Sequence, residues 1–293
     1  MPEYLEKDYR RVAAPTGPER FLPGTSIEIV RDTPPRSAPR HVLFDFDGSL
    51  SLIRAGWADV MVPMMVEILR GTGTPESPGE LHRKVRDFVM ALNGKQTIYQ
   101  MIRLAEEVRA RGGTPREPLE YKRIYHDRLM ERIRSRREGL RSGALAPEEM
   151  LVPGALELLE ALRRKGVHLY LASGTDEPYV REECALLTLN RYFGPHVYGA
   201  LDDYQSFSKA LVVERILRTN RVEGRHLLGF GDGYVEIQNI KEAGGIAVAV
   251  ASDEEHRSGK PDPWKRDRLI GAGANLVIPD YREHAALVDY FWG

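Results

Sequence analysis

Little in this sequence suits a disulfide-stapled, membrane-spanning or nucleic-acid-binding protein. Its single cysteine, Cys184, excludes a disulfide within the chain, and its place in the helix-like segment EECALL predicts a small apolar packing residue. No apolar run approaches the roughly 20 residues that a membrane-spanning helix needs. The formal net charge is only −1, from 42 basic and 43 acidic residues, so the whole chain has no field that attracts nucleic acid or an anionic membrane.

The sequence also shows no pattern typical of a secretory signal or of a zinc site. The N-terminal segment MPEYLEKDYR is charged from its start and lacks an apolar stretch, so we expect no secretory signal and a cytoplasmic location. No cluster of His or Cys residues has the spacing of a zinc site. We therefore expect a protein that acts on a small molecule, as a monomer or a homodimer, with no nucleic acid and no membrane as partner.

What the chain does have is a series of apolar segments, most of them followed by a helix-like segment. Most are continuously apolar, as expected for parallel strands that helices cover on both faces. The segment GALELLEALRRKG between two of them ends in basic residues and a glycine, which is typical of a helix end. This rhythm predicts an α/β fold with a doubly wound parallel sheet. The predicted strands are 41–45, 167–172, 197–201, 226–231, 246–251 and 276–279.

A long helical stretch interrupts this series after the first strand. Met61, Met65 and Leu69 share one face of a helix, and Tyr121 and Tyr125 lie on one face of a later helix. Such stripes predict core packing within a separate all-helical module, here called the cap. The predicted domains are an N-terminal extension at 1–39 with a candidate strand at 26–30, an α/β core at 40–54 and 151–293, and the cap at 55–150.

Polar residues gather where the predicted strands end, and ligands of doubly wound sheets bind at that edge. Two aspartates follow the first strand two positions apart, so they point the same way. A hydroxyl and a glycine follow the second strand at an expected turn, a lysine opens a helix beyond the third, and two acids follow the fourth. These residues are Asp45, Asp47, Ser173, Gly174, Lys209, Asp232 and Glu236.

The acidic residues of this edge predict a bound cation. Two carboxylates about 4 Å apart repel each other by about 4 kcal/mol at an effective dielectric of about 20, so protons or a metal ion must offset their charge. Oxygen ligands with water left in the shell suit Mg²⁺. The candidate metal ligands are Asp45, Asp47, Asp232 and Glu236.

A magnesium site beside a lysine and a hydroxyl is the equipment for phosphoryl transfer. Asp45 would attack phosphorus and carry the phosphoryl group as an acyl phosphate. Asp47 would protonate the leaving oxygen and then deprotonate the attacking water. Ser173, the Gly174 amide and Lys209 would bind the phosphate oxygens.

Four segments in this order, DFDGS, LASGT, SKALVVERI and GDGYVE, resemble the four motifs of the haloacid dehalogenase superfamily, and the phosphoglycolate phosphatase-like branch most of all. The resemblance covers residues 40–293, with 55–150 in the place of that family's helical cap. It implies a Rossmann-like core, a magnesium-dependent phosphatase and an aspartyl-phosphate at Asp45. It also implies that Asp47 is the acid/base, which meets the metal through its backbone carbonyl, and that Asp232 is a metal ligand.

Two positions depart from the family pattern. Ser49 stands where the phosphatases more often carry Thr, which keeps the hydroxyl. Glu236 stands where Asp is common, and its longer arm leaves direct and water-mediated contact with the metal both open.

The substrate is expected to be a small phosphorylated metabolite, such as a sugar phosphate or a phosphoglycolate-like acid. Candidate substrate contacts are Arg54 and Trp57 after the first motif, and Asn93 and Lys95 on a loop between cap helices, with Gln96 beside them. The alternatives are a phosphomutase with the same core, a phosphonatase that uses Lys95 to form an imine, and a catalytically silent member that binds or regulates a partner.

Overall fold

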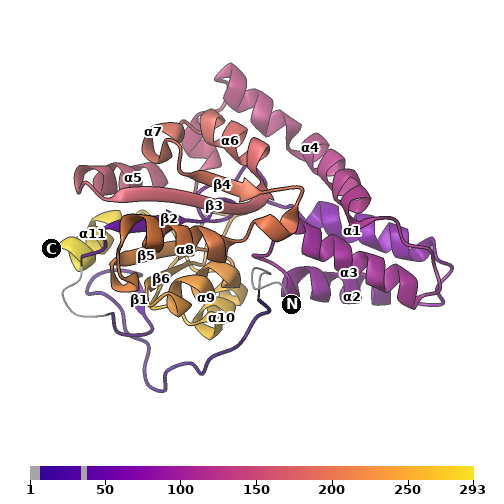
Figure 1. The fold of residues 1–293 in the computed structure, drawn as a ribbon, viewed down its shortest axis with the longest axis horizontal. Helices are drawn as coiled ribbons and strands as arrows, with labels where there is room; N and C mark the ends of the chain where they lie inside the picture. Colours follow the sequence, from indigo (N-terminus) through magenta and orange to yellow (C-terminus); the bar gives the residue numbers. More distant parts are fainter. Residues whose placement is uncertain (1–6, 34–37) are drawn as a thin grey trace.

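One mixed sheet forms the centre of the computed structural model, which describes residues 7–33 and 38–293 (Figure 1). Within these residues seven strands lie in the order β1-β7-β6-β5-β2-β3-β4, and every neighbouring pair is parallel except β1 and β7. The predicted α/β class and doubly wound sheet are confirmed. The strands are β1 (Glu28–Ile29), β2 (His41–Phe44), β3 (His168–Asp176), β4 (Val197–Ala200), β5 (Leu227–Gly231), β6 (Ile246–Val250) and β7 (Leu276–Ile278).

Each of the six predicted core strands is present, but the second one is longer than expected. We predicted that it ends at Ala172, with Ser173 and Gly174 in the following turn; that placement is wrong, because β3 continues to Asp176. The strand pairs with β4 again at its far end, where Asp176 lies opposite Ala200 after a shift in register. Ser173 and Gly174 therefore lie on an extended strand that continues past the end of β2.

Alternate side chains of the strands face two separate hydrophobic clusters, as expected for a sheet covered on both faces. In β2, Val42 and Phe44 belong to one cluster and Leu43 to the other. The first cluster packs under α5 (Ala155–Arg164), α6 (Glu177–Leu186), α7 (Asn190–Phe193) and α11 (His284–Trp292). The second packs under α8 (Lys209–Asn220), α9 (Tyr234–Glu242) and α10 (Pro263–Ala272).

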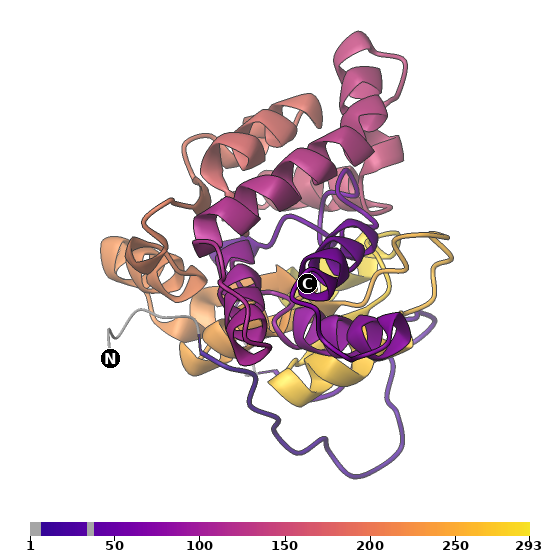
Figure 2. The same ribbon diagram turned by 90° about the vertical axis from the view of Figure 1, so that its right-hand side faces the viewer.

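Four helices stand beyond the carboxyl ends of the strands: α1 (Ala58–Arg70), α2 (Pro78–Ala91), α3 (Thr97–Ala110) and α4 (Pro118–Ser142). In Figure 2, α1–α3 stand in front of the sheet and α4 crosses above them. Met61, Met65 and Leu69 are fully buried, as their spacing predicted. The division of the chain into domains stays a prediction. None of the helices within the described residues is long and apolar enough to cross a membrane.

The predicted N-terminal extension lies on the core. Residues 1–6 and 34–37 of it are outside the described residues. The candidate strand at 26–30 is present as β1, which adds an antiparallel edge to β7. Nearer the N-terminus, Val12 donates its amide to Gly271 O, and the Asp8 carboxylate lies 2.6 Å from the Lys95 ammonium. The extension therefore touches both α10 and the loop between α2 and α3.

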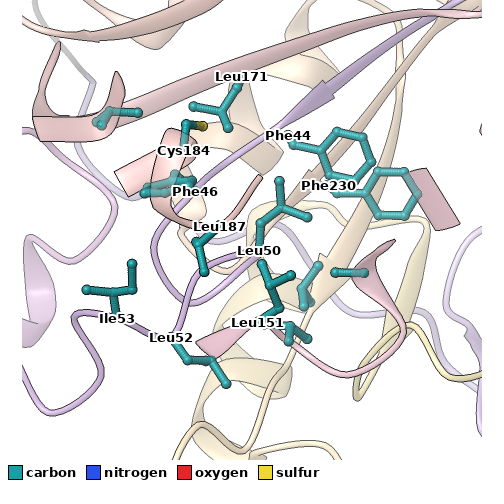
Figure 3. Close-up of a cluster of buried hydrophobic side chains, with 14 of the residues drawn as sticks. Phe44, Phe46, Leu50, Leu52, Ile53, Leu151, Leu171, Cys184, Leu187 and Phe230 are labelled. Carbon is teal, nitrogen blue, oxygen red and sulfur yellow. The ribbon is translucent and has the colours of Figure 1, made fainter. Parts of the chain in front are cut away.

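Buried apolar side chains fix the loop that follows β2 (Figure 3). Phe44, Phe46 and Leu50 are fully buried, and Phe44 stacks on Phe230 of β5 with ring centroids 4.8 Å apart. Cys184 is also fully buried in this cluster, which confirms its predicted packing role. Because the apolar residues on both sides of Asp45 and Asp47 are anchored, the positions of these two aspartates are determined by the core.

Candidate active site

The two aspartates after β2 are held by a tight turn. The Asp45 amide donates to Phe230 O of β5 at 2.9 Å, and the Leu50 amide donates to Phe46 O at 2.8 Å. Gly48 has a φ of +73°, which an L side chain rarely adopts, and a Cβ there would lie 2.2 Å from Asp232 Oδ2. The glycine therefore lets the turn approach the loop after β5, where Asp232 lies.

Asp45 forms a buried ion pair with Lys209. The Lys209 ammonium lies 2.8 Å from Asp45 Oδ1, and both side chains are almost fully buried. Burial raises the pKa of the Asp45 carboxyl, and the adjacent Lys209 opposes this shift. Lys209 also contacts the Glu236 carboxylate of α9, which lies behind Asp45. The same ammonium thus joins two of the predicted site acids.

Asp47 is held by hydroxyl groups of β3 and by an arginine. Thr175 Oγ1 donates to Asp47 Oδ2 at 2.8 Å, Ser173 Oγ donates to the same oxygen at 3.3 Å, and Arg54 Nε lies 3.8 Å from Oδ1. Burial raises the pKa of Asp47 to about 7; Arg54 lowers it, and the Glu183 carboxylate raises it. The group therefore exchanges a proton near neutral pH, which suits a general acid/base.

Arg54 is fixed by a carboxylate that is distant in the sequence. Its Nε donates to both Glu183 oxygens, at 3.2 and 3.0 Å, and its Nη2 donates to Oε1 at 2.8 Å. Glu183, on α6, is fully buried. This bidentate pair limits the freedom of the guanidinium to turn toward a substrate.

A second lysine is paired with two carboxylates of the site. The Lys265 ammonium of α10 lies 2.8 Å from Asp232 Oδ2 and 2.6 Å from Glu254 Oε1. Burial lowers the pKa of Lys265, but the two carboxylates raise it more, so the amine stays charged. Glu254 follows β6, the neighbour of β5, and its carboxylate joins the acidic group at this edge of the sheet.

These side chains surround one cavity of about 90 Å³. A single water needs about 10–15 Å³ by such a measure, so the cavity has room for a small ligand. All but two of the predicted site residues line it, and the exceptions are Glu236 and Gln96. Those lining it are Asp45, Asp47, Arg54, Trp57, Asn93, Lys95, Ser173, Gly174, Lys209 and Asp232. Gln96 does not line it; its amide donates to Phe207 O at 2.8 Å and to Tyr204 O at 3.2 Å.

Four residues of this arrangement were not predicted from the sequence. Thr175 was within the quoted motif, but no role was given to its hydroxyl. Glu254 follows a predicted strand, so the rule that located the other acids also applied to it. Glu183 and Lys265 carry no local signal, because a charged residue within a helix usually faces solvent.

The side chains that line the cavity offer the oxygen ligands that a hard divalent cation prefers. Asp45, Asp47, Asp232 and Glu254 supply only oxygen donors around it, and the buried Asp47 Oδ1 has no hydrogen-bond partner among the described residues. Within residues 7–33 and 38–293 no three His, Cys, Asp or Glu side chains are arranged to hold a metal ion. Lysine ammonium groups lie beside Asp45 and Asp232 instead. The predicted ligand roles, including that of Glu236, stay predictions.

Comparison with known proteins agrees with the fold. A family model for haloacid dehalogenase-like hydrolases matches residues 39–244. A haloacid dehalogenase hydrolase of family IA, variant 3, from Entamoeba histolytica is similar in structure, with a TM-score of 0.56 and 20% identity over 87% of this chain and 100% of that one. A search of curated proteins found no match.

Two further solved structures are similar at comparable distance. A predicted phosphoglycolate phosphatase from Haemophilus somnus has a TM-score of 0.55 and 16% identity, over 86% of this chain and 99% of that one. CbbY from Rhodobacter sphaeroides, solved in complex with xylulose-(1,5)bisphosphate, has a TM-score of 0.52 and 18% identity, over 84% and 96%. At these identities the likeness concerns the fold.

Proposed function

The chain belongs to the haloacid dehalogenase-like hydrolases, and we propose that it is a magnesium-dependent phosphatase that hydrolyses a small phosphorylated metabolite through an aspartyl-phosphate. The observation that carries this proposal is the presence in one cavity of two buried aspartates with different hydrogen-bond partners. Asp45 lies against a lysine, and Asp47 lies among hydroxyl groups with a pKa raised to about 7, chiefly by burial. Two carboxyls whose environments differ in this way suit a nucleophile and a general acid.

In the first half of the reaction, an oxygen of ionised Asp45 attacks phosphorus. The bond between phosphorus and the leaving oxygen breaks, and protonated Asp47 gives that oxygen its proton. In the second half, Asp47 takes a proton from a water molecule, whose oxygen attacks the phosphorus of the acyl phosphate. The bond from phosphorus to Asp45 then breaks, which releases inorganic phosphate and restores both carboxyls.

Phosphate oxygens would be bound by groups on two elements of the core, β3 and α8. Lys209 would stay beside Asp45 and offset the negative charge that gathers during transfer. The Ser173 hydroxyl, which donates to Asp47 in this structure, and the Gly174 amide would donate to the equatorial oxygens. A Cβ at Gly174 would lie 3.0 Å from Lys95 O. The absence of a side chain therefore lets β3 and the loop at Lys95 come close together.

The bound cation would be held by Asp45, Asp232 and the Asp47 backbone carbonyl, with Glu236 as a further predicted ligand. Magnesium, when bound, offsets the charge of the transferring phosphoryl group. Glu236 contacts Lys209 and is not among the residues that line the cavity, so beside its predicted contact with the metal we propose that it holds that lysine.

The substrate proposed is a sugar phosphate or a phosphoglycolate-like acid. The cavity is small and contains the Arg54 and Lys95 cations, with Trp57 and Asn93 on the cap side. Xylulose-(1,5)bisphosphate is bound by the similar CbbY protein, which supports the sugar phosphate class. A phosphonatase would need a lysine amine free to form an imine with its substrate, whereas the Lys95 ammonium lies 2.6 Å from the Asp8 carboxylate.

The test is turnover of p-nitrophenyl phosphate and of a panel of phosphorylated metabolites, with and without Mg²⁺. We expect magnesium-dependent release of phosphate by the native chain and none by Asp45→Asn. Isomerisation of a sugar phosphate without net release would instead favour the phosphomutase. A native protein with no turnover on any phosphoester would refute the proposal and leave the catalytically silent alternative.

A further inference from the structure

A lysine with no assigned role stands between two carboxylates at the acidic side of the cavity. The Lys265 ammonium lies 2.8 Å from Asp232 Oδ2, 2.6 Å from Glu254 Oε1 and 3.1 Å from Ser252 Oγ. An ammonium has three protons to donate, so these partners use all of them. Ser252 in turn donates to Gly48 O at 2.7 Å. Lys265 therefore ties together the loops that follow β2, β5 and β6.

This lysine is buried, and its location needs a physical reason. Only 8% of the Lys265 residue is exposed, and burial of an ammonium is costly unless charges and hydrogen bonds compensate. Both carboxylates that compensate it also line the proposed catalytic cavity. A Cβ at Gly48 would lie 2.2 Å from Asp232 Oδ2 and 3.0 Å from Glu254 Oε1, so the two acids converge on the turn between Asp47 and Ser49.

The arrangement differs on the two sides of the cavity. On the nucleophile side, Lys209 lies against Asp45 and is expected to meet phosphate oxygens. On the Asp232 side, no phosphate-binding role follows for Lys265, because Nζ is committed to Asp232, Glu254 and Ser252. Its charge acts on Asp232 at hydrogen-bond distance, and Glu254 supplies a compensating negative charge beside it.

We propose that Lys265 is a positioning residue of the metal site: it holds Asp232, offsets part of its charge, and together with Glu254 sets how tightly the site binds a divalent cation. The inference rests on the proposed metal role of Asp232. A positive charge beside a metal ligand weakens binding of a second cation, and a carboxylate that shares this charge strengthens it. Loss of Lys265 and loss of Glu254 should therefore change the affinity in opposite directions.

The experiment measures binding of Mg²⁺ alone by isothermal titration calorimetry, on the full chain after treatment with EDTA and dialysis. Lys265→Met keeps an unbranched side chain and removes the charge, and we expect the dissociation constant to fall by about tenfold or more. In Glu254→Gln, Asp232 becomes the only carboxylate partner of Lys265, and we expect the constant to rise by about tenfold.

Lys241→Met is the matched control. Nζ of this half-buried lysine donates to Asn275 Oδ1 at 2.8 Å and to Gly245 O at 3.1 Å, and it has no carboxylate partner in the part of the chain that the structure describes. We expect it to leave the Mg²⁺ dissociation constant unchanged. The melting temperature of each variant is measured in EDTA and in saturating Mg²⁺. The melting temperature of Lys265→Met should rise more on addition of Mg²⁺ than that of the native chain, because the variant binds Mg²⁺ more tightly.

A purely structural lysine predicts a different result: an equal loss of melting temperature with and without Mg²⁺, and an unchanged dissociation constant. That result, or a change of the same sign in Lys265→Met and Glu254→Gln, overturns the inference. If Lys265→Met does not fold, Glu254→Gln decides alone. Opposite shifts without any phosphoester turnover by the native chain would refute the proposed function and leave this inference standing. Phosphoester turnover by the native chain, with Mg²⁺ affinities unchanged in both variants, would refute this inference and leave the proposed function standing.

Discussion

Replacement of Glu183 by glutamine tests whether the buried pair beside Asp47 tunes the proposed acid. Arg54 Nε lies 3.0 Å from Glu183 Oε2 and 3.8 Å from Asp47 Oδ1, so these two oxygens are at most about 7 Å apart. Two unit charges at about that distance repel by about 2 kcal/mol at an effective dielectric of about 20, which equals more than one pKa unit. Without the Glu183 charge, the pKa of Asp47 should fall by about that amount from its value of about 7.

The sign of the effect on activity follows from the role of Asp47. A general acid must be protonated, so kcat/KM falls as pH rises through its pKa. In the native chain this alkaline decline should lie near pH 7, from the pKa of about 7. In Glu183→Gln it should move to lower pH by about one unit or more. The variant should also lose about 3–5 kcal/mol of unfolding free energy, because the Arg54 guanidinium stays buried without its full partner.

The assay is the pH profile of kcat/KM for p-nitrophenyl phosphate, together with thermal melts. Glu182→Gln is the matched control: its carboxylate is on the same helix, but its side chain is 43% exposed and pairs with Arg137 and Arg141. It should leave the profile unchanged and cost about 1 kcal/mol or less. A destabilised Glu183→Gln with an unshifted alkaline decline would refute the reasoning, because the pair would then be structural alone.

Three other substitutions separate turn geometry, capping and core packing. Gly48→Ala adds a Cβ 2.2 Å from Asp232 Oδ2, at a position whose φ is +73°. Mg²⁺-dependent kcat/KM should therefore fall by about tenfold or more, and an unchanged value would contradict the placement of this turn. Ser77→Ala removes the capping box of α2 and should lower the unfolding free energy by about 1 kcal/mol in melts, with normal turnover. Phe44→Ala removes a fully buried ring and should cost about 3–5 kcal/mol in urea denaturation; a cost below about 1 kcal/mol would contradict its core position.

The sequence predicted the sheet well, because continuously apolar segments are typical of parallel strands that helices cover on both faces. It could not give the length of the strand at Ser173, since the later pairing of Asp176 with Ala200 depends on the path of another strand. The capped helix that begins after Ser77 was not among the predicted helices, because its mixed, polar composition has a weaker apolar pattern than its neighbours.

The site shows the same division between local and distant signals. Asp45, Asp47 and Asp232 were identified because each follows a strand within a short motif. The partners that set their charges come from elsewhere: the Glu183 carboxylate of α6 raises the pKa of Asp47, and Lys265 reaches Asp232 from α10. Such pairs depend on three-dimensional packing between segments that are far apart in the chain, which no spacing rule encodes.

The central claim is that Asp45 carries the phosphoryl group, and the most direct measurement is to trap that intermediate. Native protein with Mg²⁺ is mixed with a phosphorylated substrate that it turns over, quenched in acid, digested and analysed by mass spectrometry. The account predicts a phosphorylated peptide in which the alkali-labile label is on Asp45, and no label in Asp45→Asn. Release of phosphate with no label on Asp45, or an equal label in Asp45→Asn, would contradict it.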